Sequence, residues 1–385
     1  MPFGYLFTVV LIATCTLVAL APQRPRRTTR SSVRFWLSFL VNEVPFLAFY
    51  LLVASTLLAL AQGDLDTPVG WVALAIAVLA TVGLGVVAWR GVHAHPVLQR
   101  ALHDGLGAGW RDSLDPEIAS RLHRRLPLAR ILVAPFFFRR RDVEQVANIR
   151  YGDAGRANLL DLYRHRSHPL KAPVLIHLHG GAFRSGRKSR ESRALFYRLA
   201  SRGWICVSAN YRLRPATFPD HLIDVKKVIA WVREHGQGFG ADPNVVLVAG
   251  SSAGGHLAAC AALTANDAGF QPGFEQADTS ILASVSLYGY YGRIETQGPP
   301  SSPRDYIAAD APPFLVVHGD KDTLVRVEDA RDFVGQLRST STRPVVYAEL
   351  PGAQHTLDMF HSLRFEAVVD AIEEFAAWVR SSARA

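Results

Sequence analysis

The sequence is short of cysteine and of charged residues. Its 385 residues include only 3 cysteines, and they form no CxxC pair or Cys/His zinc spacing, which excludes a disulfide framework and the common zinc-binding modules. Charged residues make up 19% of the chain and hydrophobic residues 49%. A chain this apolar is not disordered. It is also more apolar than a soluble enzyme of its length usually needs, so we expect some apolar side chains to face lipid.

Lysine is absent from the first 141 residues, where 15 arginines stand against 7 acidic residues. This segment therefore holds +8 of the formal net charge of +9. The excess charge lies beside apolar segments, as in membrane proteins that face anionic lipid. No RNA-recognition, zinc-finger or basic-zipper pattern accompanies it, so nucleic acid is not an expected partner.

Long apolar runs are concentrated at the N-terminus. Three of them approach the roughly 20 residues that a helix needs to cross a bilayer, and they cover about residues 3–21, 36–61 and 69–89. A cleaved signal peptide is disfavoured because no Lys or Arg precedes Phe3. Glu43 and Pro45 lie near the start of the second run. We predict a transmembrane region of three helices within residues 1–90 and an integral, multi-pass membrane protein.

The charges of the connecting segments predict the orientation of this region. The segment between the first two runs carries five arginines, namely Arg24, Arg26, Arg27, Arg30 and Arg34. The segment between the second and third runs has only Asp64 and Asp66, and Arg90 follows the third run. Positively charged connections stay in the cytoplasm. We therefore expect the N-terminus outside and the large C-terminal part in the cytoplasm. That compartment keeps thiols reduced, which suits the free Cys206 and Cys260.

Residues 91–145 are predicted to form a membrane-proximal linker or cap. They mix arginines with apolar residues and end on Phe136–Phe138 followed by Arg139–Arg141. Aromatic residues beside arginines suit the headgroup boundary and anionic lipid. A cap that packs its phenylalanines on the following domain explains the same pattern, and both readings stay open.

Residues 146–385 read as a catalytic domain in which strands alternate with helices. The expected strands are 146–151, 158–163, 173–178, 204–209, 245–249, 282–287, 313–317 and 345–349. The expected helices are 191–201, 222–235, 253–265, 328–337 and 365–379. Apolar strands separated by amphipathic helices indicate an α/β fold with a mostly parallel sheet covered on both faces. The first two strands are short and close together, which favours an antiparallel edge.

The strongest motif is Gly250-Ser251-Ser252-Ala253-Gly254, between an expected strand and an expected helix. A nucleophilic serine requires this context, because it lies on a sharp and strained turn that the flanking glycines make possible. The motif predicts Ser252 as the nucleophile, with Gly250 and Gly254 in support.

A second motif, His179-Gly180-Gly181, directly follows the strand expected at 173–178. Its small residues allow the N–H groups of Gly180 and Gly181 to form an oxyanion hole with that of Ala253. The alternative is a metal pair of His177 and His179 on one strand face. No third ligand of suitable spacing accompanies them, so we expect no metal and a structural role for both histidines.

The chain order Ser, acid, His predicts the other two catalytic residues. Asp322 follows the strand at 313–317, and His355 follows the strand at 345–349. Asp320 is the minority alternative for the acid, because an Asp beside a turn glycine commonly serves local hydrogen bonds. His361 is a weaker competitor for the histidine because it precedes the last helix.

With these motifs, the chain from about Val146 resembles the α/β-hydrolase superfamily, and within it the hormone-sensitive-lipase-like carboxylesterases. Tyr211-Arg212, Pro219 and Asp224 are similar to a structural stretch of that family, in which Asp224 would pair with Arg212. The sequence differs from many members at Ser251, where they have Asp, and at Ala182-Phe183 after the His-Gly-Gly motif. Its N-terminus resembles membrane-attached lipase and esterase homologues of actinobacteria.

The resemblance implies a serine carboxylesterase or lipase that acts on small-molecule or lipid esters at a membrane. It implies a Ser252-Asp322-His355 triad and an acyl-enzyme, without any cofactor. An amidase, formamidase or acyltransferase with the same triad, or a catalytically weak membrane scaffold, is the alternative.

Overall fold

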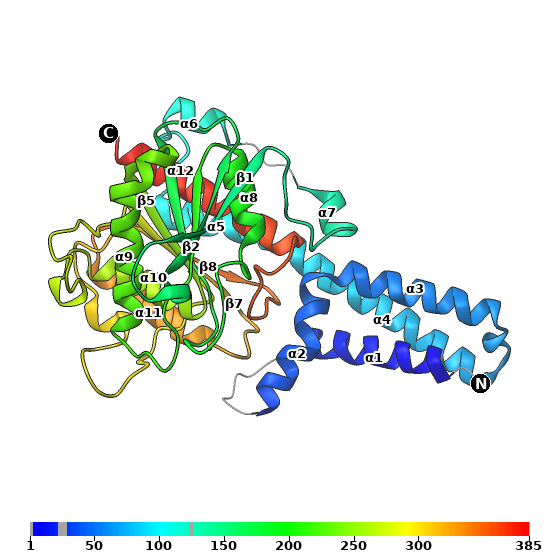
Figure 1. Cartoon of the computed structure of the whole chain (residues 1–385). Coiled ribbons are helices and arrows are strands. Elements are labelled where there is room, and N and C mark those ends of the chain that lie inside the picture. Colours follow the sequence, from blue (N-terminus) through cyan, green and yellow to red (C-terminus); the bar gives the residue numbers. More distant parts are fainter. Residues whose placement is uncertain (1–2, 22–28, 123–125, 385) are drawn as a thin grey trace.

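The computed structural model describes residues 3–21, 29–122 and 126–384, which form an α/β domain and a helical bundle that projects from it (Figure 1). The α/β domain is built on an eight-stranded sheet of order β1-β2-β4-β3-β5-β6-β7-β8. The strands are β1 (Val143–Arg150), β2 (Leu159–His165), β3 (Ala172–Leu178), β4 (Ile205–Ala209), β5 (Ala241–Ser251), β6 (Ala283–Leu287), β7 (Phe314–Gly319) and β8 (Val345–Leu350). Each lies within a few residues of its predicted position.

The sheet is parallel except at one edge. There β1 and β2 pair antiparallel with each other, and β2 pairs antiparallel with β4, which confirms the predicted edge. Strands β3, β4, β6 and β7 are buried along their whole length. Continuous burial suits apolar runs that helices cover from both sides.

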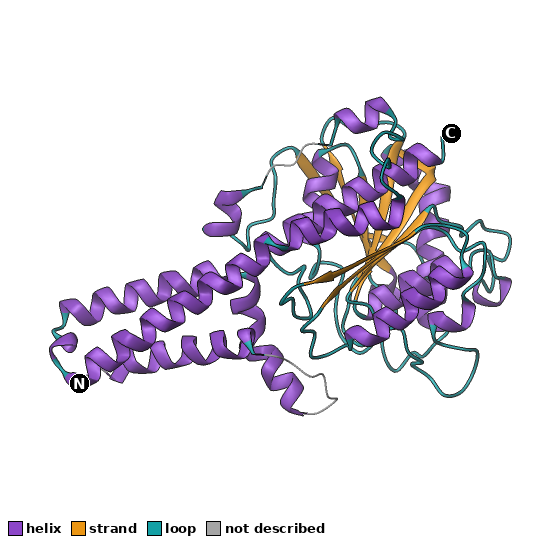
Figure 2. Ribbon diagram, turned by 180° about the vertical axis from the view of Figure 1, so that it is seen from behind, coloured by secondary structure: helices purple, strands orange, loops and turns teal. Residues whose placement is uncertain are grey.

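Two layers of helices cover the sheet (Figure 2). One face carries α5 (Ala94–Leu106), α8 (Arg193–Ser201) and α12 (Leu363–Ser382). The other face carries α9 (Asp220–His235), α10 (Ala253–Leu263) and α11 (Val327–Thr340). Short helices in the connections are α6 (Pro116–Ser120), α7 (Leu128–Leu132), η2 (Gly155–Asn158), η3 (Gly236–Phe239), η4 (Ala268–Phe270) and η5 (Pro303–Tyr306). The arrangement is an α/β-hydrolase fold.

The bundle consists of α1 (Phe3–Leu20), α3 (Pro45–Ala61) and α4 (Pro68–Val92), with the turn η1 (Asp64–Asp66) at its far end. Helices α1 and α4 pack closely at Gly83, where a Cβ would meet Thr16 Cγ2 at 2.7 Å, as small residues allow in helix pairs within membranes. Large apolar side chains such as Phe7, Leu57 and Leu79 face outward. Helices α1 and α4 are long and apolar enough to cross a membrane.

The second apolar run differs from the single helix expected over 36–61. It forms α2 (Thr29–Glu43) and α3, which meet at an angle of 86°. Pro45 is the first residue of α3, where its missing N–H is harmless but where it cannot continue a preceding helix. Glu43 is buried against the α/β domain rather than in the bundle.

Residues 91–145 pack in part on the α/β domain, as the cap reading expects, and the headgroup role stays a prediction. Helix α5 continues from α4 (Figure 2) and packs on β8 and α12 in the domain core. Phe138 is buried in the same core, whereas Phe136 and Phe137 are exposed. The region is therefore partly an extra helical layer of the domain and partly an apolar surface.

Candidate active site

Ser252 occupies the sharp turn between β5 and α10. Its φ of 55° and ψ of −115° are rare for a residue with a side chain. The flanking glycines are required by close backbone approach. A Cβ on Gly250 would meet the carbonyl oxygen of Gly254 at 2.0 Å, and a Cβ on Gly254 would meet that of Leu178 at 2.0 Å. The Gly-x-Ser-x-Gly spacing therefore follows from the lack of room for a Cβ at either side of this turn.

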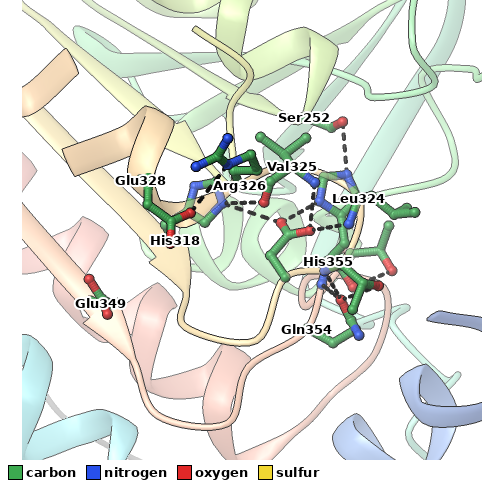
Figure 3. A network of polar contacts seen from close by, with 12 residues as sticks. Ser252, His318, Leu324, Val325, Arg326, Glu328, Glu349, Gln354 and His355 are labelled. Atoms are coloured by element: carbon green, nitrogen blue, oxygen red, sulfur yellow. Dashed lines mark hydrogen bonds and ion pairs between the residues drawn. The ribbon is translucent and has the colours of Figure 1, made fainter. Parts of the chain in front are cut away.

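His355 lies between Ser252 and Asp322, and Figure 3 shows the hydrogen bond between its ring and Ser252. Its Nε2 is 2.9 Å from Ser252 Oγ, and its Nδ1 is 2.6 Å from Asp322 Oδ2. Asp322 comes from the loop after β7 and His355 from the loop after β8. The structure therefore brings together the three residues that the sequence predicted as catalytic.

Asp322 is buried and held as a carboxylate. Burial alone would raise its pKa, but His355 and His318 together hold the pKa well below its ordinary value. Its Oδ1 accepts the N–H groups of Leu324 and Val325, each at 2.8 Å. His318, whose Nε2 is 3.3 Å from Asp322 Oδ2, was missed by sequence reasoning, although it lies four residues before Asp322 at the end of β7.

The two minority alternatives lie elsewhere. Asp320 Oδ1 accepts the N–H of Gly352 at 2.6 Å, so this carboxylate ties together the two loops that carry Asp322 and His355. His361 Nδ1 is 2.5 Å from Glu366 Oε1. Within the described part of the chain, neither Asp320 nor His361 forms a hydrogen bond with the ring of His355.

The loop after β3 lies against Ser252. A Cβ on Gly180 would come within 3.0 Å of Ser252 Cβ. The N–H of Gly180 donates to Glu191 Oε2 at 2.5 Å, so this predicted oxyanion donor is engaged, because a carboxylate is a strong acceptor. Arg190 Nε in turn donates to Glu191 Oε1 at 2.9 Å. Ala182, with a positive φ of 53°, lines the pocket at Ser252.

A buried polar cluster lies behind the nucleophile and was not predicted. Asp358 accepts hydrogen bonds from Ser251 Oγ at 2.6 Å and from Ser192 Oγ at 2.5 Å, and it contacts the hydroxyl of Tyr288. The ring of Tyr288 lies edge-on to His355, with 4.6 Å between centroids. Asp358 thus places a carboxylate beside position 251. The only signal in the sequence was that Ser251 stands where many similar sequences have Asp.

The other histidine pair has the structural surroundings expected of it. His177 Nε2 is 3.0 Å from Ser251 Oγ, and burial lowers the pKa of His177 to about 3. The ring of His179 stacks on Tyr211. Among the described residues, no group of three or more His, Cys, Asp or Glu side chains is placed to hold a metal ion. The predicted pair of Arg212 and Asp224 forms, with Nε 2.9 Å from Oδ2.

A pocket of about 360 Å³ opens at Ser252. Apolar side chains such as Phe183, Ile294 and Leu324 line it together with Arg184 and other arginines. A pocket of this volume is in the range of small-molecule sites.

Helices α1 and α2 contact the loops of Asp322 and His355 directly. The ring of Phe35 in α2 lies edge-on to His355, with 6.4 Å between centroids. Asn42 Nδ2 donates to the carbonyl of Gly352 at 2.7 Å. Lys321 Nζ donates to the carbonyl of Leu20 at 2.7 Å, at the end of α1. None of these contacts was visible in the sequence.

In this site a serine on a strand-to-helix elbow is hydrogen-bonded to a histidine, and that histidine is hydrogen-bonded to an aspartate. This combination is typical of the α/β-hydrolase class. The BD-FAE family model matches residues 160–295. The probable carboxylic ester hydrolase LipM of Mycobacterium tuberculosis is 38% identical over 99% of this chain and 94% of its own length. Esterase LipQ of the same organism is 37% identical over 77% of each chain.

Solved structures agree on the fold. Esterase 2 of Thermogutta terrifontis with butyrate bound superposes with a TM-score of 0.53 at 23% identity, over 61% of this chain and 93% of its own. The chain belongs to the α/β-hydrolase superfamily, in the family of carboxylic ester hydrolases that includes LipM.

Proposed function

We propose that the protein is a membrane-anchored serine carboxylesterase or lipase that hydrolyses esters through an acyl-enzyme. One observation carries the proposal, namely the hydrogen-bonded chain from Ser252 through His355 to Asp322 on a strained elbow. The family supports the reaction class, since its members are named carboxylic ester hydrolases and esterases.

The reaction follows from this geometry. Nε2 of His355 accepts the proton of Ser252 as Oγ attacks the ester carbonyl carbon, and the carbonyl oxygen becomes an oxyanion. His355 then gives the proton to the leaving alcohol, and the acyl group stays on Oγ. A water molecule that loses its proton to His355 attacks the acyl carbon, releases the acid and restores Ser252. Asp322 keeps the Nδ1–H tautomer and stabilises the imidazolium.

The oxyanion is assigned to N–H groups beside Ser252. Ala253 is the first residue of α10, where a helix N-terminus adds partial positive charge. Gly181 and Ala182 are the donors from the loop after β3, because Glu191 already engages the N–H of Gly180. Ala182 thus takes the role that we predicted for Gly180.

Labelling with a fluorophosphonate probe tests the nucleophile. Ser252→Ala is expected to abolish both labelling and ester hydrolysis while leaving the far-ultraviolet circular dichroism unchanged. Ser251→Ala is the matched control, because the hydroxyl of Ser251 is turned to Asp358 and His177. It should keep the label. Labelling of Ser252→Ala at the wild-type rate would exclude the assignment.

The membrane part of the proposal rests on the bundle. Helices α1, α3 and α4 run alongside one another with apolar outer faces, and the N-terminus and η1 lie at the end far from the α/β domain (Figure 1). With three crossings, the arginines between the first two helices and the catalytic domain would share one side, and the positive-inside rule supports a cytoplasmic assignment for that side.

Membrane extraction and protease accessibility test this part. The protein should stay in the membrane fraction after a carbonate wash, and protease added to intact spheroplasts should leave the α/β domain whole. Release by carbonate would contradict the anchoring, and cleavage of the domain from outside would reverse the orientation.

A further inference from the structure

An apolar surface surrounds the point where the bundle meets the α/β domain. We call it the junction collar, and it consists of Val33, Trp36, Leu40, Val133, Phe136 and Phe137, all exposed. The largest of these side chains stand well out of the protein, with 67% of Trp36 and 60% of Phe137 exposed. Exposed apolar residues that cluster in this way mark a contact surface.

The two halves of the junction collar form one surface, although they are about a hundred residues apart in the chain. A row of aromatic rings joins them. Trp36 contacts Phe39 at 5.7 Å between centroids, Phe39 contacts Phe360 at 5.8 Å, and Phe360 contacts Phe136 at 5.2 Å. Phe360 belongs to the loop that carries His355, so this row also reaches the catalytic loop.

The direction of α2 fixes how this surface meets a bilayer. Helix α2 makes an angle of 86° with α3. If α3 crosses the membrane along its normal, α2 lies in the plane of the interface, on the side of the α/β domain (Figure 1). Arg34, Arg139 and Arg141 are exposed beside the collar. Aromatic residues flanked by arginines are the composition of helices that lie among anionic headgroups.

The buried side of α2 reaches the catalytic histidine. Phe35 and Ser38 are buried; the ring of Phe35 lies against His355, and Ser38 Oγ accepts Gln354 Nε2 at 3.3 Å. Helix α2 therefore exposes Trp36, while the neighbouring Phe35 packs against His355. The exposed face of α2 is thus separated from His355 by the width of this helix alone.

We propose that the junction collar lies in the headgroup layer of the bilayer and that the site takes esters presented by that bilayer. This deepens the proposed function and rests on it. The occupant of the collar is the lipid surface itself, because α2, which carries half of the collar, leads directly into α3, and α3 exposes large apolar side chains such as Leu51 and Leu57.

The position of the collar is tested by spin labels on the full-length protein. The variants are Trp36→Cys, Phe137→Cys and the control Leu170→Cys, each with Cys15→Ser, reconstituted in vesicles of phosphatidylcholine and phosphatidylglycerol. Leu170 is 83% exposed in the connection between β2 and β3, and Cys206 and Cys260 are buried. Labels at positions 36 and 137 should report a depth of about 5–10 Å into the boundary between headgroups and acyl chains, and a label at 170 should be in water. Labels at 36 and 137 as accessible to water as that at 170 would overturn the proposal.

The substrate class is tested with Trp36→Ser, Phe137→Ser and the control Leu170→Ser. Each of the first two should raise the KM for a long-chain ester presented in those vesicles by about tenfold, the lower end of what exposing one large apolar side chain costs. The kcat for a short, water-soluble ester should stay within twofold of the wild type, which also reports that the variants fold. Leu170→Ser should change neither value.

The outcomes separate this inference from the proposed function. Loss of the soluble-ester activity in wild type and variants alike would defeat the esterase proposal. If the enzyme is active and embedded in the bilayer, but Trp36→Ser and Phe137→Ser leave its KM for bilayer esters unchanged, the proposal for the junction collar is wrong and the esterase proposal is unaffected. Equal loss on both substrates would also defeat it, because a general packing defect would then explain the effect.

Discussion

The nucleophile and its two partners are held in different ways. Ser252 is positioned by neighbours in the chain, since the strand, the turn and the helix that hold it are contiguous. The loops of Asp322 and His355 are held by contacts across the chain, from Asn42 to Gly352 and from the end of α1 to Lys321. One half of the site belongs to the α/β domain alone, and the other half is shared with α1 and α2. We therefore expect the activity of the domain to depend on these two helices.

The largest expected effect concerns Asp322. Asp322→Asn should lower kcat by about 10⁴-fold, because the amide favours the wrong tautomer of His355. Asp320→Asn is the matched comparison, since Asp320 contacts the backbone of Gly352 instead of His355. It should lower kcat by less than about tenfold, the effect of one weakened hydrogen bond. Steady-state kinetics with a soluble ester measures both, and the reverse ranking would move the acid to Asp320.

A smaller effect is expected on the side of the nucleophile. Asp358→Asn replaces an acceptor for the hydroxyls of Ser251 and Ser192 by a group that also donates. The cost of the mismatch is about 1–3 kcal/mol. It should lower the melting temperature. If the same energy is lost from the transition state, kcat should fall by about tenfold to hundredfold. Unchanged melting and kinetics would show that the cluster does not support the elbow.

A still smaller effect is expected on the shared side. Asn42→Ala removes the hydrogen bond to Gly352, next to the His355 loop, at a cost of about 1 kcal/mol. The kcat of the full-length enzyme should fall a few-fold. Asn244→Ala is the control, because Asn244 is exposed at the start of β5, far from the bundle. Equal kcat values for the two variants would mean that the loops do not depend on the bundle.

The same division explains how far the sequence could predict the structure. The glycines around Ser252 are a local signal, because backbone close to backbone leaves no room for a Cβ. Asp322 and His355 were found by their order along the chain. By contrast, Phe35, Asp358 and Glu191 reach the site through tertiary contacts, and no local pattern marks them. The bend before Pro45 was signalled only by that proline and by Glu43, since hydropathy alone favours one straight helix over 36–61.

The last expected effect concerns the pH dependence of stability instead of the rate of hydrolysis. Burial lowers the pKa of His177 to about 3 and that of His256 to about 4, against about 6.5 in the unfolded chain. At a pH between the folded and the unfolded pKa, each histidine is therefore neutral in the folded protein and binds a proton when the protein unfolds. Its stabilising contribution is complete above about pH 6.5 and is lost as the pH falls toward the folded value. Buried carboxylates with raised pKa values, such as Glu191, act in the opposite direction.

A single substitution isolates the histidine contribution. In His177→Gln the free energy of unfolding should depend on pH less than in the wild type, by about 1.4 kcal/mol per pH unit between roughly pH 6 and 4. Denaturant titrations of the α/β domain signal at each pH measure the difference. His235→Gln is the control, since His235 is exposed at the end of α9. It should keep the wild-type slope. A slope in His177→Gln equal to the wild type would mean that His177 is charged in the folded enzyme, and the neutral pairing of its ring with Ser251 behind the nucleophile would then be wrong.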